Sequence, residues 1–225
     1  MSILDLIKTG INTLRFNYCV FGLNGLLKFQ VIIGPRIKFG SLSRGSINIC
    51  SKGIARLRIG VGEGSFHHGK SLYGYVNLEK DCKLSILGRA SMAQGIVLNI
   101  SRNAICTLGD KFSANYGCII SIAKGLKTDS NVRLGWNVSI LDSDGHAIID
   151  RNNQQTNTNR SIYIGNNVWI AAKATIMKGT KLEDNTIIPY GSIITKSNLE
   201  KNCIFGGMPN HILKNNVRWD YESEK

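Results

Sequence analysis

The segment LDSDGH, from Leu141 to His146, places two carboxylates and one imidazole within five consecutive residues. The whole chain of 225 residues has only 15 acidic residues and 4 histidines, so this concentration is unusual for it. An imidazole can accept a proton near neutral pH, and a neighbouring carboxylate can fix its tautomer and orientation. Aspartates also cap turns through their own backbone. The segment is therefore a candidate general base, a candidate metal site or a polar turn, and its surroundings must decide.

A repeat of six residues surrounds this segment. An aliphatic residue returns at every sixth position six times in succession, and a small or β-branched residue follows most of these by four positions. Six matches neither the helical period of about 3.6 nor the strand period of about 2. We interpret each step as one flat face of a triangular coil, a short strand followed by a corner, so that three steps complete one turn. The aliphatic positions are Ile164, Ile170, Ile176, Leu182, Ile188 and Ile194.

Composition limits the kind of protein. With 43% hydrophobic and 19% charged residues, 24 glycines and 3 prolines, the chain is typical of a globular protein built from short extended segments. Its formal charge of +13 indicates an anionic ligand, polymer or membrane surface. The basic residues form no run of five and no known nucleic-acid-binding motif, so we expect no nucleic acid partner. The six cysteines form no CxxC pair, and no secretion signal or spanning segment is present, so we expect a cytoplasmic protein.

Two stretches carry a family resemblance. Residues 162–197, IYIGNNVWIAAKATIMKGTKLEDNTIIPYGSIITKS, are followed by FGGMPNHILK at residues 205–214. Together they resemble the C-terminal half of the hexapeptide-repeat acyltransferases, which are left-handed parallel β-helices that transfer an acetyl group from acetyl-CoA. The resemblance is closest to the O-acetyltransferases of capsule and O-antigen loci and to galactoside and maltose acetyltransferases. It implies the left-handed coil, which the period of six alone does not.

The expected fold is an all-β solenoid, a left-handed parallel β-helix, in three parts. Residues 1–44 form an N-terminal cap that begins with an amphipathic helix, because apolar residues recur there at helical spacing. Residues 45–200 form the β-helix, interrupted by an inserted polar loop at 141–161. Residues 201–225 form a tail with a short helix. We favour a cap over the open end of the solenoid; peripheral membrane attachment is an alternative that does not exclude it.

The resemblance assigns catalytic roles to the inserted loop. In the family a catalytic histidine precedes a long loop and then the motif VWI, and here Trp169 of VWI follows His146 by 23 residues. His146 is thus implied as the general base for a hydroxyl group. Asp142 and Asp144 are candidates for the carboxylate that orients its imidazole, with a preference for Asp142. Because either aspartate could instead cap a turn, the choice stays open.

Substrate-binding residues follow from the same resemblance. Asn115 in FSANYG matches an asparagine that holds the acceptor sugar, although an asparagine at a corner of the coil is an equally simple reading. Trp169 is expected to pack against the acceptor, or else to be structural. Backbone groups, a Thr-Lys pair and two cations are implied as contacts of acetyl-CoA. These positions are Ala172, Tyr190, Thr195, Lys196, His211 and Lys214, of which Tyr190 and His211 depart from the family pattern.

We therefore expect an acetyl-CoA-dependent acyltransferase that O-acetylates a sugar hydroxyl of a surface polysaccharide or its precursor by direct transfer. The family implies a homotrimer with each site between two subunits. Acylation of an amino sugar and a non-enzymatic binding solenoid stay as alternatives. A zinc site like that of γ-class carbonic anhydrases needs histidines on adjacent coils, whereas His146 stands alone and the pair His67 and His68 lies about 80 residues upstream. We expect no metal.

Overall fold

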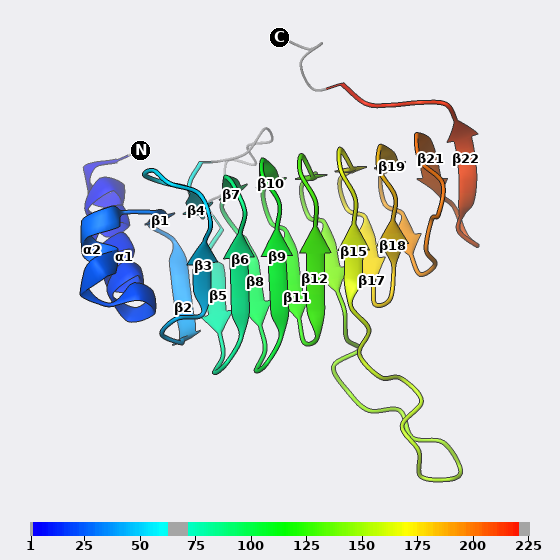
Figure 1. The fold of residues 1–225 in the computed structure, drawn as a ribbon, viewed down its shortest axis with the longest axis horizontal. Coiled ribbons are helices and arrows are strands. Elements are labelled where there is room, and N and C mark those ends of the chain that lie inside the picture. The colour runs from blue at the N-terminus through cyan, green and yellow to red at the C-terminus, as the bar shows by residue number, and fades with distance from the viewer. Residues whose placement is uncertain (1, 63–71, 221–225) are drawn as a thin grey trace.

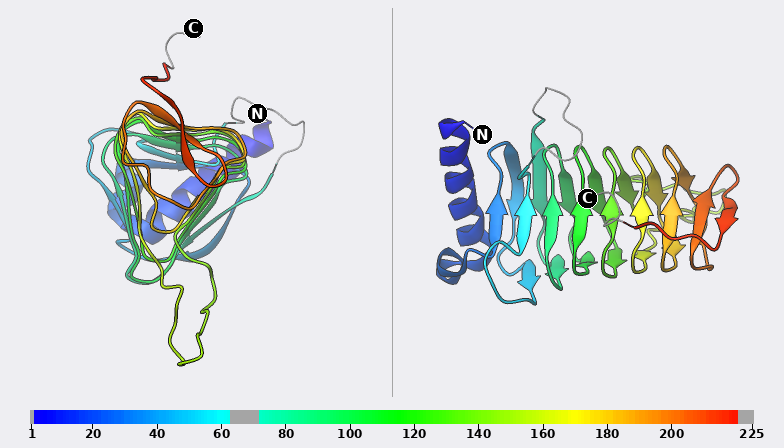
Figure 2. Two further views of the ribbon diagram at one scale, coloured as in Figure 1. Left: turned by 90° about the vertical axis from the view of Figure 1, so that its right-hand side faces the viewer. Right: turned by 90° about the horizontal axis from the view of Figure 1, so that it is seen from above.

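The computed structural model describes residues 2–62 and 72–220 (Figure 1). Helices α1 (Ile3–Phe21) and α2 (Leu23–Lys28) lie at one end of a parallel β-helix, whose coils stack along the long axis of the molecule. Seen down that axis, the coils superpose as a triangle (Figure 2). The parallel β-helix predicted from the period of six is confirmed.

The three faces of the triangle are three sheets, which we name A, B and C. Within the described residues every neighbouring pair of strands is parallel except the last pair of sheet A, β21 and β22. Sheet A contains β1 (Val31–Ile33), β4 (Leu57–Ile59), β7 (Ala90–Met92), β10 (Phe112–Ala114), β13 (Arg133–Leu134), β16 (Trp169–Ile170), β19 (Thr186–Ile188), β21 (Cys203–Gly206) and β22 (His211–Asn215). Sheet B contains β2 (Ile37–Leu42), β5 (Gly74–Leu78), β8 (Val97–Ile100), β11 (Ile119–Ile122), β14 (Ser139–Leu141), β17 (Thr175–Met177) and β20 (Ile193–Ile194). Sheet C contains β3 (Ile47–Ile49), β6 (Lys83–Ile86), β9 (Ile105–Leu108), β12 (Gly125–Thr128), β15 (Ile162–Ile164) and β18 (Lys181–Leu182).

The aliphatic positions of the repeat fill the interior. On sheet B, Ile140, Ile176 and Ile194 are register partners in successive coils, and all three are fully buried. Because each face takes about six residues, the aliphatic position points inward at the same place on every face. Equivalent positions of successive coils therefore stack along the axis of the solenoid. Each fully buried aliphatic side chain contributes about 1.5–3 kcal/mol of transfer free energy, which makes the stack the main source of stability.

An asparagine ladder links the coils at the corner between sheets C and A. The Asn131 side-chain amide donates to the Asn167 side-chain oxygen at 2.6 Å, and the next two steps of the ladder, to Asn185 and Asn202, measure 2.7 and 2.8 Å. All four residues have φ between 54° and 58°. Asparagine tolerates this left-handed conformation better than other non-glycine residues, and its amide both donates and accepts. The corner is therefore closed by one repeated side chain.

The N-terminal helices cover the first coil. The Asn17 amide donates to the Val31 carbonyl at 2.9 Å, and the Ile33 amide donates to the Thr13 hydroxyl at 3.0 Å. These bonds occupy polar groups of β1, the edge strand of sheet A, while Phe16 is buried against the core. The solenoid begins here, at Val31, and not at residue 45. The spacing of six between Val31 and Ile37 is the signal that the sequence boundary missed.

The tail is a strand and not the short helix expected from the sequence. Strand β22 (His211–Asn215) folds back and pairs antiparallel with β21. The last parallel strand would otherwise leave its backbone unpaired, and pairing fulfils those hydrogen bonds, whereas an isolated helix of about five residues is unstable in water. Residues 216–220 then run back along the solenoid (Figure 1).

Candidate active site

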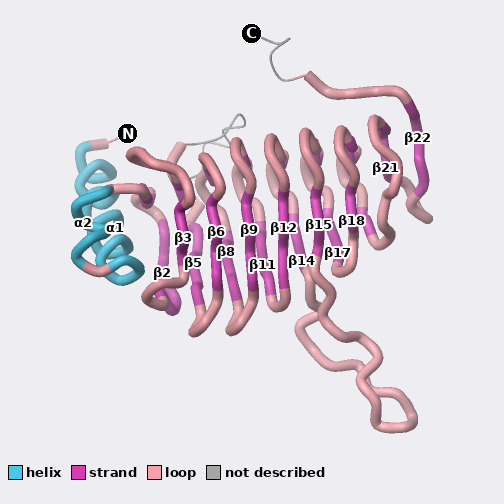
Figure 3. The backbone as a smooth tube through the Cα atoms, in the orientation of Figure 1, coloured by secondary structure: helices cyan, strands magenta, loops and turns pink. Residues whose placement is uncertain are grey.

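The inserted loop leaves the solenoid between β14 of sheet B and β15 of sheet C and projects far from the body (Figures 1 and 3). Its two ends are held together, because the Arg160 amide donates to the Asp142 carbonyl at 3.2 Å. Near its tip, an antiparallel bridge joins Ile149 to Gln155, and the Asp150 carboxylate accepts two backbone amides. Side chains and turns thus order the loop in place of a sheet.

Asp142 anchors the loop to the preceding coil. Its side chain is fully buried, and its carboxylate accepts the backbone amides of Ala123, Lys124 and Gly125 at 2.7, 2.8 and 2.6 Å. Both oxygens are therefore used in closing the turn between β11 and β12. No hydrogen bond joins this carboxylate to the His146 imidazole within the described residues. Asp142 instead fixes the start of the loop to the preceding coil of the solenoid.

Asp144 and Asn157 fix the backbone around the candidate base. The Asp144 carboxylate accepts from the Lys178 ammonium and from the Asn157 amide, the latter at 2.9 Å. The same amide donates to the His146 carbonyl at 2.7 Å, and the Asn157 side-chain oxygen accepts the Ile148 amide at 2.6 Å. The hydrogen bonds from Lys178 and Asn157 hold the pKa of Asp144 below its ordinary value. Asp144, Asn157 and Lys178 form what we name the loop clamp.

The His146 side chain is exposed, and within the described residues its imidazole makes no hydrogen bond. Gly145 precedes it with φ of 80°, a conformation that glycine adopts without steric cost. The segment is therefore fixed through its main chain while the ring stays available to an external group. A fixed main chain and an exposed ring together suit a general base that acts on a bound substrate.

Four of the expected site residues gather along the corner between sheets A and B. Trp169 lies on the outer surface of β16 and is 41% exposed, two residues before the corner. Ala172 and Tyr190 occupy equivalent corner positions one coil apart, since the Gly191 amide donates to the Ala172 carbonyl at 2.9 Å. Asn115 belongs to the same corner two coils before Ala172, and its side-chain oxygen accepts the Tyr116 amide at 2.7 Å.

The expected acetyl-CoA contacts near the C-terminus cluster around the last coil. Thr195 and Lys196 follow β20, while His211 and Lys214 lie on β22. A residue that the sequence did not single out joins these segments: Asn210 is buried, accepts the Thr195 amide at 2.8 Å and donates to the Ile193 carbonyl at 2.8 Å. Its position in the motif PNHILK was the available signal.

A second tryptophan lies beside Trp169. The Trp219 indole donates to the Asn167 carbonyl at 2.7 Å, its ring centroid is 6.3 Å from that of Trp169, and the Arg133 guanidinium lies 5.8 Å from it. No role was assigned to this part of the tail from the sequence. An aromatic residue in an otherwise polar tail was the signal, but its partner was set by the path of residues 216–220 over sheet A.

Within one chain the loop and the tryptophan pair are kept apart. The loop starts at the corner between sheets B and C, whereas Trp169, Ala172 and Asn115 border the corner between sheets A and B. These corners are the two opposite edges of sheet B. His146 and Trp169 thus belong to segments that meet sheet B at its opposite edges.

No group of three or more His, Cys, Asp or Glu side chains that could hold a metal ion occurs in residues 2–62 and 72–220. His67 and His68 lie outside the described residues.

Triangular coils with a hexad repeat define a fold class, the parallel β-helix. Residues 161–196 match the family described as bacterial transferase hexapeptide (six repeats). The chain is 30% identical over 112 residues to the galactoside O-acetyltransferase of Escherichia coli (strain K12), a match that covers 48% of this chain and about half, 52%, of that enzyme. It is also 24% identical over 194 residues to an uncharacterized 24.8 kDa protein in the cps region of Klebsiella pneumoniae, covering 86% and 83% of the two chains.

Among solved structures, the polySia-specific acetyltransferase NeuO superposes with a TM-score of 0.61 at 21% identity, over 82% of this chain and 72% of that one. This similarity supports the fold alone. The predicted resemblance to hexapeptide-repeat acyltransferases and the left-handed β-helix are confirmed. The roles of individual residues stay predictions.

Proposed function

We propose that the protein transfers an acetyl group from acetyl-CoA to a sugar hydroxyl of a surface polysaccharide or its precursor. The observation that carries this proposal is His146, held by its backbone in an ordered loop with its ring exposed. Curated relatives named as acetyltransferases support the reaction class. The relative named for its cps region agrees with a polysaccharide acceptor.

The site forms between subunits of a homotrimer. Part of the outer surface of sheet B supports this arrangement, because Tyr75, Val97 and Ile119 are register partners there. The row then passes through Ser139 and Thr175 to Ile193. Tyr75, Ile119 and Ile193 are exposed in the single chain. Exposed apolar side chains grouped on a sheet are typical of a subunit interface. Packing through sheet B brings the loop of one chain to the Trp169 corner of its partner.

In the reaction, His146 removes the proton from the sugar hydroxyl as the hydroxyl oxygen attacks the thioester carbonyl carbon. The tetrahedral intermediate then collapses, the carbon–sulfur bond breaks, and the sulfur takes the proton from the imidazolium. Trp169 packs against the acceptor ring. Asp142 and the loop clamp act through the backbone and position the base; Asn115 binds the acceptor.

For acetyl-CoA, the backbone of Ala172 and Tyr190 lines the pantetheine arm along the corner between sheets A and B. Lys196 and Lys214, both exposed, meet the phosphates, with His211 beside them. Because the Thr195 amide already donates to Asn210, contact at that position depends on Lys196 and not on the threonine backbone. Tyr190 is exposed, and the Lys173 ammonium lies 5.5 Å from the centroid of its ring. This aromatic residue therefore narrows the path of the pantetheine arm.

Four of the six cysteines are unsuited to forming an acyl-enzyme, which favours direct transfer; of the other two, Cys19 is partly buried and Cys50 is exposed. Cys82, Cys106, Cys118 and Cys203 are buried. Burial raises the pKa of Cys118 to about 12 and that of Cys106 further, which keeps both thiols protonated. A protonated, inaccessible thiol is a poor nucleophile.

The outer face of α1 supports the predicted peripheral membrane association. Leu4, Ile7, Ile11 and Leu14 recur every three or four residues, are exposed, and lie opposite the face that packs on the solenoid. No helix of the described residues is long and apolar enough to cross a membrane. We expect flotation with anionic vesicles to be lost on replacing Ile7 and Ile11 by Ser; unchanged flotation would contradict the association.

A thiol-release assay with a panel of acceptors tests the proposed reaction. Neutral and anionic oligosaccharides, an amino sugar and no acceptor are compared at saturating acetyl-CoA, and the acetylated product is located by mass spectrometry. Ester formation on a glycan supports the proposal. Amide formation would favour N-acylation, and absence of acetyl-CoA binding at millimolar concentration would favour the non-enzymatic solenoid.

A further inference from the structure

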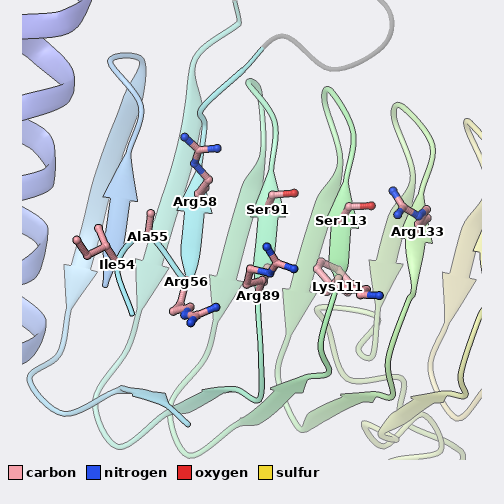
Figure 4. Close-up of a pocket in the computed structure, with 11 residues that line it drawn as sticks. Ile54, Ala55, Arg56, Arg58, Arg89, Ser91, Lys111, Ser113 and Arg133 are labelled. Carbon is pink, nitrogen blue, oxygen red and sulfur yellow. The ribbon is translucent and has the colours of Figure 1, made fainter. Parts of the chain in front are cut away.

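Sheet A carries a groove of about 710 Å³ on its outer surface, across β4, β7, β10 and β13 (Figure 4). None of the described residues that line the groove is acidic. Its cations come from successive coils and are Arg56, Arg58, Arg89, Lys111 and Arg133.

One row of the groove follows the outward positions of the strands. Arg58, Ser91, Ser113 and Arg133 are register partners in turn, and Arg133 pairs with Trp169 on the next coil. Parallel strands lie about 4.8 Å apart, so the row from Arg58 to Arg133 extends roughly 15 Å. The row therefore ends at the tryptophan pair of the candidate site.

A second row occupies the corner before these strands. Arg56 and Arg89 are equivalent, since the Ala90 amide donates to the Arg56 carbonyl at 2.8 Å, and Lys111 follows on the next coil. In the coil after Lys111 this corner position belongs to Asn131, the first member of the asparagine ladder. The same corner thus carries cations in the earlier coils and the asparagine ladder in the later coils.

Four of the five groove cations have no carboxylate partner within the described residues. Arg56, Arg58, Arg89 and Lys111 form no ion pair there, and the Arg56 Nε atom is buried without a hydrogen-bond partner. Asp110, an acid at this corner, accepts the Arg89 backbone amide at 2.7 Å. Cations kept together without carboxylate partners repel one another and favour an anionic ligand.

We propose that this groove binds an anionic polysaccharide along its length and delivers it to Trp169, an inference that rests on the proposed glycan acetylation. Guanidinium groups pair with repeated carboxylates or phosphates, and Ser91 and Ser113 between them suit sugar hydroxyls. Single-stranded nucleic acid is disfavoured because stacking needs exposed aromatic residues, and the one aromatic lining residue, Phe112, is buried. The proposed contacts of the acetyl-CoA phosphates, Lys196 and Lys214, lie at the other end of the solenoid.

Matched charge removal tests the groove. The groove variant carries Arg58→Ser, Arg89→Asn and Lys111→Asn. The first and last copy the next coil, which holds Ser91 and Asn131 at these positions, and Arg89→Asn extends the same corner asparagine by one further coil. The control removes three charges from sheet C through Lys83→Ser, Lys127→Thr and Lys181→Thr, where the register partner of Lys127 is Thr107. The probes are oligogalacturonate, a phosphate-linked teichoic acid, neutral dextran and a single-stranded oligodeoxynucleotide.

We expect the groove variant to bind at least one anionic glycan roughly tenfold more weakly at low salt, and the control to change by less than about threefold. Comparing oligogalacturonate with teichoic acid identifies the preferred anion. Equal loss in the control, equally tight binding of dextran, or tighter groove-dependent binding of the oligonucleotide would overturn the proposal.

The readouts separate the two proposals. Groove-dependent glycan binding without acetyl transfer to any glycan would remove the proposed reaction and leave the binding groove in place. Conversely, acetyl transfer to glycans with unchanged polyanion binding in the groove variant would remove the groove alone. Turnover on a small neutral acceptor is expected to be the same in the groove variant and the wild type, because such an acceptor reaches Trp169 without the groove.

Discussion

The coils and the inserted loop satisfy their backbone polar groups in opposite ways. Each coil pairs with the coil before and after it through parallel strands, and its corner repeats one side chain, as in the asparagine ladder. The loop has no sheet partner and relies on a few particular side chains, Asp142, Asp150 and Asn157. The stacked coils, which we call the wall, are therefore held by many repeated contacts that reinforce one another. The loop is ordered, but the loss of one side chain can displace His146 without disturbing the solenoid.

Removing the base itself should give the largest effect. We expect His146→Ala to reduce turnover roughly 100- to 10,000-fold, the range of general-base contributions, while acetyl-CoA affinity and thermal stability stay unchanged. Gln154→Ala at the exposed tip of the same loop is the control and should retain activity. Near-wild-type turnover of His146→Ala, measured with an accepted glycan, would exclude the histidine as the base.

The reverse pattern is expected in the wall. Ile176→Ala removes a fully buried side chain from the aliphatic stack and should lower the free energy of unfolding by about 2–5 kcal/mol. Its turnover below the melting temperature should fall little, since no loop contact is altered. Denaturant unfolding measures the first quantity and thiol release the second. A large loss of turnover in folded Ile176→Ala protein would mean that wall and loop are not independent.

Asp142 joins the two regions, so its replacement should affect both. In Asp142→Asn one carboxylate oxygen becomes an amide donor that faces the amides of Ala123, Lys124 and Gly125. Charge-assisted bonds are lost and donors are left unpaired, at a cost of about 2 kcal/mol. We expect lower stability together with reduced turnover. A change in turnover with unchanged unfolding would instead indicate that this carboxylate acts on the imidazole.

The contrast between wall and loop also explains what could be predicted from the sequence. The aliphatic stack follows from a local rule repeated many times, so Ile164 to Ile194 predicted the coil without any knowledge of contacts. The contacts of Asp142 and Trp219 depend on which turn or strand lies beside them, and no period encodes that. Hence the sequence preferred Asp142 as the partner of the imidazole but left turn capping open, and only the structure reveals its bonds to the turn between β11 and β12. The helix expected near His211 was wrong because the open sheet edge recruits that segment as a strand.

Breaking the loop clamp should have a moderate effect confined to the loop. Asn157→Ala removes the bonds to Asp144, to the His146 carbonyl and to the Ile148 amide. We expect turnover to fall roughly tenfold through misplacement of the base, with KM for acetyl-CoA unchanged. Asn153→Gly, at the exposed tip of the loop, serves as the control. Equal effects of the two variants would show that general loop mobility, and not the clamp, limits turnover.

The smallest expected effect is the response of the clamp to acid. Hydrogen bonds from Lys178 and Asn157 hold the pKa of Asp144 below its ordinary 3.8 in the folded protein. Since the folded value is depressed, the stabilisation is present above the ordinary pKa and is lost as pH falls through the lowered value. The clamp should therefore persist unchanged from neutral pH down to about pH 4. NMR titration of the Asn157 side-chain amide should give a midpoint below 3.8, and Asp144→Asn should abolish that transition. A midpoint at or above the ordinary value would mean that the ion pair does not form in solution, and the His146 backbone would then be held by Asn157 without it.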